Sequence, residues 1–282
     1  MVELAGENMS VSSLNGSSID VRYGYCVLFG AIFFFQVLNK FVSYLGPPKT
    51  LKDSEDEFWK YKNVLISWIH ACIVGPWTLA CALFLNEYWT DSIVYVEIYG
   101  YSLLAFSTGY FLYDCFDCIV NNKVFKMWEV CLHHVAVIST FLYNLVQVKF
   151  VGYVIYALLV EVNSIFLHAR KLMQMAKVDF NHSFYKLNNI FNILTFSIFR
   201  FGALVIITYG MASLYEYKRI LVHGSQGYCI TLMASMFTMW VINPILYWRL
   251  VKNDFLRKKH YRSKSENSLD VNGSNNNVKK VD

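Results

Sequence analysis

The sequence predicts an all-α polytopic membrane protein, built as a compact bundle of about seven transmembrane helices. Of its 282 residues, 56% are hydrophobic and 16% are charged, whereas about 25% are charged in an ordinary soluble domain. Only four prolines occur, so long helices are permitted. The apolar residues form runs of roughly 20, the length that a helix needs to cross a bilayer. This composition argues against a disordered chain, an ordinary cytosolic enzyme and a nucleic-acid-binding protein.

Seven apolar runs follow one another with short connections and without an internal repeat. They lie near Tyr23–Tyr44, Val64–Leu85, Val94–Val120, Trp128–Leu145, Phe150–His168, Leu187–Tyr209 and Gly227–Trp248. Residues 1–20 contain no Lys or Arg, unlike a cleavable signal peptide, so we expect the first run to be an uncleaved anchor. Four tryptophans fall at the predicted span edges, as in an interfacial aromatic belt: Trp59, Trp89, Trp128 and Trp248.

The distribution of Lys and Arg predicts the orientation of the bundle. With seven spans, nineteen basic residues fall on the side that holds the C-terminus and four on the side that holds the N-terminus. Because basic loops stay in the cytosol, we expect a cytosolic C-terminus and an N-terminus outside. Two glycosylation sequons, at Asn8 and Asn15, fit an outside N-terminal tail.

Ionisable side chains inside the predicted spans are the candidate functional residues, because such groups are costly in hydrocarbon. Almost all of them fall in the half of the membrane expected to face the cytosol, which predicts a polar chamber open to that side. The candidate lipid-binding residues are Asp114, Asp117, His133, His134, Glu161, Asn192 and Arg200, and His133 and His134 are also the candidate catalytic residues.

Helical spacing places several of these residues on shared faces. Asp114 and Asp117 are three apart, and Glu161, Ser164 and His168 form one stripe. Asn189 and Arg200 are eleven residues apart, about three helical turns, so we expect them to lie on nearly the same face of a helix.

Structural roles remain open for the same groups. The histidines can form interhelical hydrogen bonds, the aspartates can be wetted near the surface, and Glu161 can form a structural ion pair with Arg200. His70 and Asn243 are interpreted as structural.

The seven cysteines all fall within predicted spans, which implies no disulfide framework. Cys115 and Cys118 form a C-x-x-C pair, but the sequence offers no second pair of metal ligands, so we expect neither a metal nor a cofactor.

The run Trp128–Val135, with its adjacent histidines, resembles the double-histidine signature of the TLC-domain family, and Gly109–Asp117 resembles the span with two aspartates that precedes it. This family includes ceramide synthases and translocating-chain-associating membrane proteins. The resemblance covers about residues 58–250 and implies a bundle of the TLC-domain type. At Val160–His168 the chain departs from the ceramide synthase motif H-D-x-S-D-x-x-L-E, and the form Glu161–Arg170 looks instead like TLC domain-containing proteins 1 and 2.

That branch implies a regulator of membrane phospholipid composition and fluidity, which limits long-chain polyunsaturated acyl chains in phospholipids, and it brings no established catalytic activity. The expected partners are membrane phospholipids or fatty-acyl chains. An acyl-CoA-dependent acyltransferase related to ceramide synthases is the alternative, with a histidine as base or acyl carrier. A transporter is a third hypothesis, since His and Asp inside membranes also build proton relays.

The domain organisation follows from these observations. We expect an extracytosolic tail over 1–22, an anchor and cytosolic loop over 23–57, a TLC domain over 58–250, and a basic, disordered cytosolic tail over 251–282. The basic cluster Arg249–Lys264 is suited to anionic lipid. The resemblance implies the plasma membrane, whereas Lys279 and Lys280 resemble a dilysine signal for retrieval to the endoplasmic reticulum.

Overall fold

The computed structural model describes residues 19–51 and 54–278, without the side chains of residues 214–215 and 253–278. The described part of the chain is helical, with no strand. Seven of its helical segments are long and apolar enough to cross a membrane. The predicted all-α bundle of seven spans is therefore confirmed. The sequons at Asn8 and Asn15 and the pair Lys279–Lys280 lie outside the described residues.

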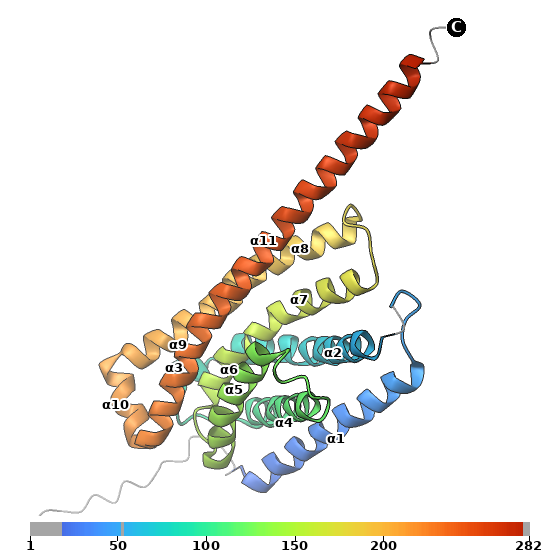
Figure 1. Ribbon diagram of the computed structural model, residues 1–282. Coiled ribbons are helices and arrows are strands. Elements are labelled where there is room, and N and C mark those ends of the chain that lie inside the picture. The colour runs from blue at the N-terminus through green and yellow to red at the C-terminus, as the bar shows by residue number, and fades with distance from the viewer. Residues whose placement is uncertain (1–18, 52–53, 279–282) are drawn as a thin grey trace, which may run out of the picture.

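The helices follow the chain in the order shown in Figure 1. They are α1 (Val21–Leu45), α2 (Glu55–Phe84), α3 (Glu87–Thr90), α4 (Ile98–Val120), α5 (Trp128–Gln147), α6 (Val151–Leu158), α7 (Val160–Met175), α8 (Ser183–Thr195), the π-helix η1 (Phe196–Phe201), α9 (Gly202–Ala212), α10 (Leu214–His223) and α11 (Gln226–Val278). The seven spans are α1, α2, α4, α5, the pair α6–α7, the series α8–η1–α9, and the first half of α11.

Helix α4 lies at the centre of the bundle, in contact with α1, α2, α5 and α6. Small residues allow the closest of these approaches. A Cβ atom on Gly109 of α4 would lie 2.5 Å from the carbonyl oxygen of Leu28 on α1, so only glycine permits the backbones to pack this tightly. The aromatic ring of Phe35, also on α1, is fully buried in the core.

Helices α2 and α7 form a second close pair, and α11 closes the bundle against α5. Gly75 of α2 faces the backbone of Glu161 on α7, where an added Cβ atom would lie 3.3 Å from the Glu161 carbonyl oxygen. This contact brings the polar residues of α7 next to those of α2.

Two of the spans are irregular. The fifth is interrupted at Leu159, between α6 and α7. The sixth contains η1, a π-helical turn that holds Arg200. A π-helical turn carries an extra residue and rotates everything beyond it relative to an uninterrupted α-helix, and such turns are frequent at functional sites.

The structure also differs from the sequence-based expectation at three places. Helix α2 begins at Glu55 rather than near Val64, because the acidic first turn Glu55–Glu57 stabilises a helical start ahead of the apolar part. The short helices α3 and α10 were not predicted, since hydropathy reports only long apolar runs.

Helix α11 continues to Val278, across residues for which composition predicts disorder. A helix that is already formed in the membrane is extended one residue at a time without the cost of a new nucleus.

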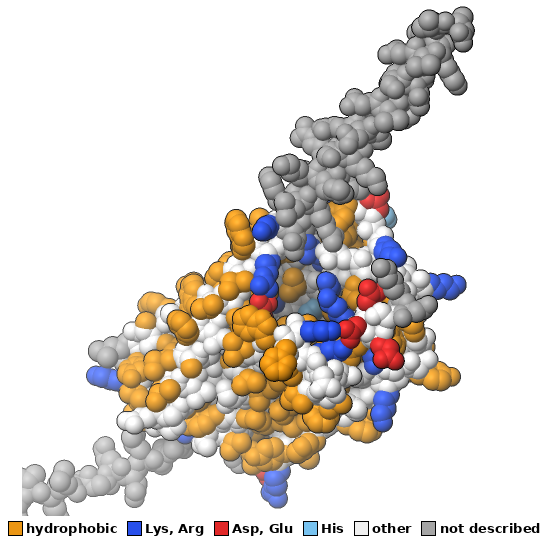
Figure 2. All heavy atoms as spheres, in the orientation of Figure 1, with side chains coloured by type: hydrophobic (Ala, Val, Ile, Leu, Met, Phe, Trp, Pro, Cys, Tyr) orange, Lys and Arg blue, Asp and Glu red, His pale blue; other side chains and the backbone are white. Residues whose placement is uncertain are grey.

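The surface has an apolar belt between two ends that carry charged side chains, and Lys and Arg are more numerous at one of these ends. Large apolar side chains such as Phe33, Phe116 and Phe237 are exposed, as expected for surfaces that face lipid. Figure 2 shows hydrophobic side chains spread over most of one face, with Lys, Arg, Asp and Glu gathered around a hollow. We call the end that holds the loops around residues 46–51, 121–127 and 176–182 the basic end.

Candidate functional site

A polar chamber lies among α2, α4, α5, α7, η1 and α11, with a cavity volume of about 220 Å³. Its polar lining consists of Asn63, Ser67, His70, Tyr110, Asp114, Glu129, His133, His134, Glu161, Ser164, His168, Arg200 and Asn243. Met127, from the loop before α5, also lines it, so the chamber reaches the basic end of the bundle. The polar residues of six separate helical segments thus converge on one space.

Asp114 of α4 is the centre of a buried polar cluster in the chamber. One carboxylate oxygen lies 3.0 Å from Nδ1 of His134 on α5, within ion-pair distance although the two groups are not aligned for a hydrogen bond. The other oxygen accepts a 2.6 Å hydrogen bond from the amide of Asn63 on α2. Both Asp114 and His134 are buried. A carboxylate held beside an imidazole orients that ring and stabilises its protonated form, as a general acid or base requires.

A second cluster is built around His70 of α2. Its imidazole stacks on the ring of Tyr110, with ring centroids 3.8 Å apart and planes at 15°. Nδ1 of His70 lies 3.7 Å from a carboxylate oxygen of Glu161 on α7. The Tyr110 hydroxyl and the Ser67 hydroxyl are 2.9 Å apart. Nε2 of His70 is buried and has no hydrogen-bond partner among the described residues.

Arg200 of η1 is held at the inner part of the chamber by neutral groups from two other helices. It donates to the side-chain oxygens of Asn163 (2.7 Å), Ser164 (3.1 Å) and Asn243 (3.2 Å). The guanidinium group also lies over the ring of Phe196, 5.1 Å from its centroid. These contacts fix a buried cation without a directly bonded carboxylate among the described residues.

An apolar pocket of about 70 Å³ continues from the chamber. The two spaces share six lining residues: Phe111, His133, Val160, Glu161, Arg200 and Asn243. Beyond these residues the pocket is lined by apolar side chains, among them Phe141, Leu204 and Ile207. The site therefore combines polar groups at the basic end with an apolar extension into the bundle.

Five of the seven candidate lipid-binding residues line the chamber: Asp114, His133, His134, Glu161 and Arg200. The adjacent histidines both line it, and His133 Nδ1 also lies 3.0 Å from the sulfur of Met239 on α11. The stripe of Glu161, Ser164 and His168 is confirmed, since all three residues line the chamber.

Asp117 and Asn192 support the site from outside its lining. The Asp117 carboxylate is turned toward α1 and α2, where it accepts hydrogen bonds from Asn39 (3.1 Å) and the Trp59 indole (2.9 Å). Residues three apart on a helix, such as Asp114 and Asp117, point in directions about 60° apart. The polar partners on α1 and α2 therefore bind Asp117 outside the chamber. Asn192 is fully buried, and its side-chain oxygen accepts a 2.9 Å hydrogen bond from the amide of Asn163, the residue that also binds Arg200.

Two expected relationships are wrong. No ion pair joins Glu161 to Arg200 among the described residues: Glu161 lies near His70, and Arg200 is held by amides and a hydroxyl. Asn189 does not share the chamber with Arg200 either. The π-helical turn that holds Arg200 explains the second error, because it departs from the 3.6-residue period on which the eleven-residue spacing depends.

Sequence reasoning did not identify Asn63, Ser67 and Tyr110, and it interpreted His70 and Asn243 as structural. Helical spacing could have pointed to three of them. Ser67 precedes His70 by three residues and Asn63 precedes Ser67 by four, while Tyr110 precedes Asp114 by four. Within the described part of the chain, no three His, Cys, Asp or Glu side chains are placed to hold a metal ion.

Comparison with known proteins gives a consistent family assignment. The model of the TLC domain matches residues 60–252. The chain is 31% identical over 247 residues to the TLC domain-containing protein 2 of Danio rerio, an alignment that covers 84% of this chain and 94% of that protein. It is 28% identical over 249 residues to the TLC domain-containing protein 1 of Homo sapiens, which covers 84% of this chain and 94% of the relative. The chain therefore belongs to the TLC domain family of multi-pass membrane proteins.

Proposed function

We propose that this protein is a regulator of membrane phospholipid composition and fluidity, which limits the long-chain polyunsaturated acyl chains in phospholipids and acts by binding lipid in its intramembrane chamber. The observation that carries the proposal is that the polar chamber and the apolar pocket share part of their lining. A polar chamber with several ionisable groups opens into an apolar pocket that is lined by Phe141, Leu204 and Ile207. Ligand sites typically combine an apolar lining with a few convergent polar groups.

The polar groups of the chamber are matched to the head group or carbonyl end of a lipid. Arg200 offers a fixed cation, and His70 offers a buried ring nitrogen that has no partner in the described part of the chain. Buried polar groups without a partner are rare, because leaving a donor or acceptor unpaired costs about 1–3 kcal/mol. A polar ligand group that hydrogen-bonds to Nε2 of His70 would remove this cost.

One observation favours a second candidate function, an acyl-CoA-dependent acyltransferase. A carboxylate oxygen of Asp114 lies 3.0 Å from Nδ1 of His134, and a hydrogen bond between these two groups would activate the histidine as a general base or nucleophile. On the adjacent span, Val160, Glu161 and Ser164 occupy the positions where ceramide synthases carry His, Asp and Asp. Those replacements favour the regulator.

Two measurements test these functions. In cells that lack the protein, we expect more polyunsaturated phospholipid and unchanged ceramide, with reversal by the wild-type chain and not by a variant that carries Arg200→Gln. The matched control is Arg22→Gln, since Arg22 is exposed at the start of α1 and does not line the chamber. Unchanged phospholipid in the deficient cells contradicts the regulator.

The second measurement uses purified protein with a sphingoid base and an acyl-CoA. An acylated product that His134→Ala abolishes would establish the acyltransferase. The regulator is supported if the wild-type protein forms no product while lipid still purifies with it.

We also propose that the protein resides in the plasma membrane, with the N-terminus outside and the C-terminus in the cytosol. The excess of Lys and Arg at the basic end supports this orientation. The basic segment Arg249–Lys264 would contact anionic lipid of the inner leaflet. An epitope at the C-terminus should be reached by antibody only after permeabilisation, and staining of intact cells would contradict the orientation. Retention in the endoplasmic reticulum that Lys279→Ser with Lys280→Ser relieves would contradict the plasma-membrane location.

A further inference from the structure

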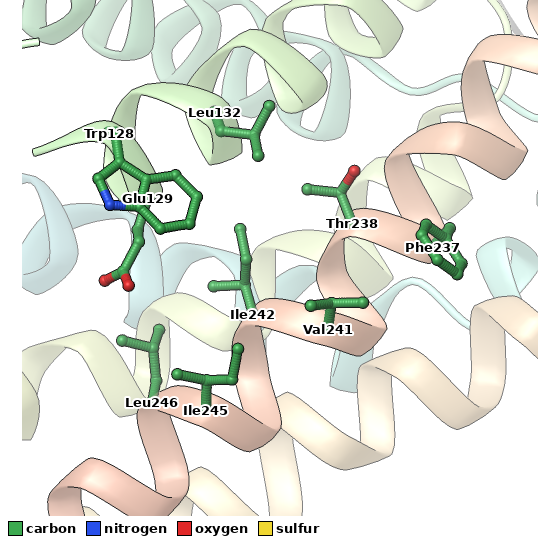
Figure 3. Close-up of a pocket in the computed structure, with 9 residues that line it drawn as sticks. All are labelled: Trp128, Glu129, Leu132, Phe237, Thr238, Val241, Ile242, Ile245 and Leu246. Atoms are coloured by element: carbon green, nitrogen blue, oxygen red, sulfur yellow. The ribbon is translucent and has the colours of Figure 1, made fainter. Parts of the chain in front are cut away.

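A groove runs along the outside of the bundle between α5 and α11, with a volume of about 160 Å³. Figure 3 shows side chains from the two helices facing one another across it. Trp128, Glu129 and Leu132 come from α5, and Phe237, Thr238, Val241, Ile242, Ile245 and Leu246 come from α11. Both helices are membrane spans, so this groove faces hydrocarbon rather than water.

The α11 side of the groove is one continuous apolar stripe. Its residues recur at spacings of three and four, which keeps them on one face over about 14 Å of helix. Thr238 presents no free donor, because its hydroxyl donates to the carbonyl of Ala234 at 2.9 Å. Phe237 and Val241 are exposed, with 71% and 46% of their surfaces accessible. The stripe is therefore suited to an extended hydrocarbon chain.

Only a thin wall separates the groove from the polar chamber. Glu129, Ile242 and Leu246 line both spaces. Deeper in the bundle α5 and α11 are joined by polar contacts, His133 with Met239 at 3.0 Å and Ser235 with the Ala136 carbonyl at 3.0 Å. A chain lying in the groove consequently meets the chamber only at the level of Ile242 and Leu246.

Charge is confined to the end of the groove near the basic end. Arg249 of α11 donates to the Glu129 carboxylate of α5 at 2.7 Å. Arg249 follows Ile245 by four residues, so it continues the same stripe. This pair of opposite charges, with Arg249 exposed and Glu129 partly buried, complements a zwitterionic head group, whose phosphate can contact Arg249 while its ammonium contacts Glu129.

We propose that this groove is a lateral portal, in which an acyl chain of a zwitterionic diacyl phospholipid lies between α5 and α11 and reaches the chamber past Ile242 and Leu246. The inference rests on the proposed function, since it presumes that the chamber binds lipid. It adds the route and the class of lipid: a phospholipid taken from the bilayer plane, with its head group at the Glu129–Arg249 pair.

Photo-crosslinking of the full-length chain tests the portal. The protein is placed in nanodiscs of dioleoylphosphatidylcholine that contain a phosphatidylcholine with a diazirine in one acyl chain, and labelled peptides are mapped by mass spectrometry. In the wild type we expect label on Leu132 and Val241 in the groove and on chamber residues of α7.

The variant Ile242→Trp thickens the wall. We expect chamber labelling to fall by about tenfold, the change that corresponds to about 1.4 kcal/mol, while groove labelling persists. Leu246→Trp is a second variant with the same expected effect. The matched control is Ile230→Trp, an exposed position on the same helix outside the groove, which should leave both signals unchanged. Size-exclusion and thermal-unfolding profiles show whether each variant is folded.

The outcomes separate the portal from the chamber. Label in the wild-type chamber without label in the groove overturns the portal and leaves the lipid chamber standing. Chamber labelling that persists at the wild-type level in folded Ile242→Trp and Leu246→Trp does the same. Labelling of the chamber by a diazirine fatty acid and not by the phospholipid overturns the class of lipid. An unlabelled chamber with every probe overturns the proposed function itself.

Discussion

Nδ1 of His134 on α5 lies 3.0 Å from the carboxylate of Asp114 on α4, and Asn63 of α2 holds the other oxygen of the same carboxylate at 2.6 Å. Three helices that are separated in the sequence are thereby linked through one buried carboxylate. Asp117, three residues further along α4, is linked instead to Asn39 and Trp59. The two aspartates therefore serve different neighbours despite their spacing.

Double-mutant cycles should distinguish these aspartates. We expect Asp114→Asn and His134→Ala to be coupled by about 1 kcal/mol or more in the free energy of unfolding, because the two groups are in contact. The cycle of Asp117→Asn with His134→Ala should be additive within about 0.5 kcal/mol. Unfolding of purified protein in detergent provides the measurement, and equal coupling in both cycles would refute the arrangement.

The stack of His70 on Tyr110 makes a second prediction. Tyr110→Phe keeps the ring and loses only the contact between the Tyr110 and Ser67 hydroxyls, so it should cost about 0.6 kcal/mol, the average for hydrogen bonds between membrane helices. Tyr110→Ala also removes the ring and leaves a cavity, and its cost should be several times larger. Thermal unfolding compares the two variants. Equal losses would mean that the hydroxyl, rather than the stacked ring, dominates.

A pair of glycines provides a matched test of helix packing. Gly109→Ala would place a Cβ atom 2.5 Å from the carbonyl oxygen of Leu28, so α1 and α4 must separate, and we expect a loss of about 1–3 kcal/mol. Gly30→Ala meets nothing within 4 Å and lies inside α1, where alanine favours the helix by up to about 1 kcal/mol. The two substitutions should therefore shift the unfolding temperature in opposite directions. A stable Gly109→Ala variant would contradict the close approach.

The stability of the protein should decrease in acid because of Asp91, which lies at the end of the bundle opposite the basic end. Burial acts to raise the pKa of Asp91, but hydrogen bonds from the Val94 backbone and the Arg219 guanidinium outweigh it and hold the pKa below its ordinary value. The folded pKa is lower than the unfolded one of about 3.9. The resulting stabilisation is present above the unfolded pKa and is lost as the pH falls through the folded pKa.

Unfolding temperatures measured between neutral and acidic pH should show this loss. The Asp91→Asn variant cannot titrate at this position, so its unfolding temperature should decline less steeply with acid than that of the wild type. Parallel declines for the two proteins would show that Asp91 does not contribute.

The seven spans could be predicted because each is a run of apolar side chains long enough to cross a bilayer, and lipid leaves the backbone of such a run little choice but a helix. Helices α3 and α10 could not, since a helix of four or ten residues has no comparable hydropathy signal. The convergence of Asp114, His134 and Glu161 on one chamber followed from their depth in the membrane.

What the sequence could not provide was the partner of each polar group. The Asp117 carboxylate points toward α1 and α2 because it accepts hydrogen bonds from Asn39 and Trp59, which become its neighbours only through tertiary packing. The separation of Glu161 from Arg200 depends on Asn163 and on the π-helical turn. Such a turn depends on local packing that no periodicity of side chains reveals.

Phe35 packs against His70 and Tyr110, two residues that line the chamber, so the core of the fold includes α1. Phe35 belongs to α1, ahead of the matched residues 60–252, yet its ring lies 6.0 Å from that of His70 and 5.0 Å from that of Tyr110. A fragment that starts after α1 would lose the ring of Phe35 from beside His70 and Tyr110 and the backbone of Leu28 from beside Gly109. The amino-terminal helix thus supports two lining residues of the chamber from outside, and its packing belongs to the same core as the other six spans.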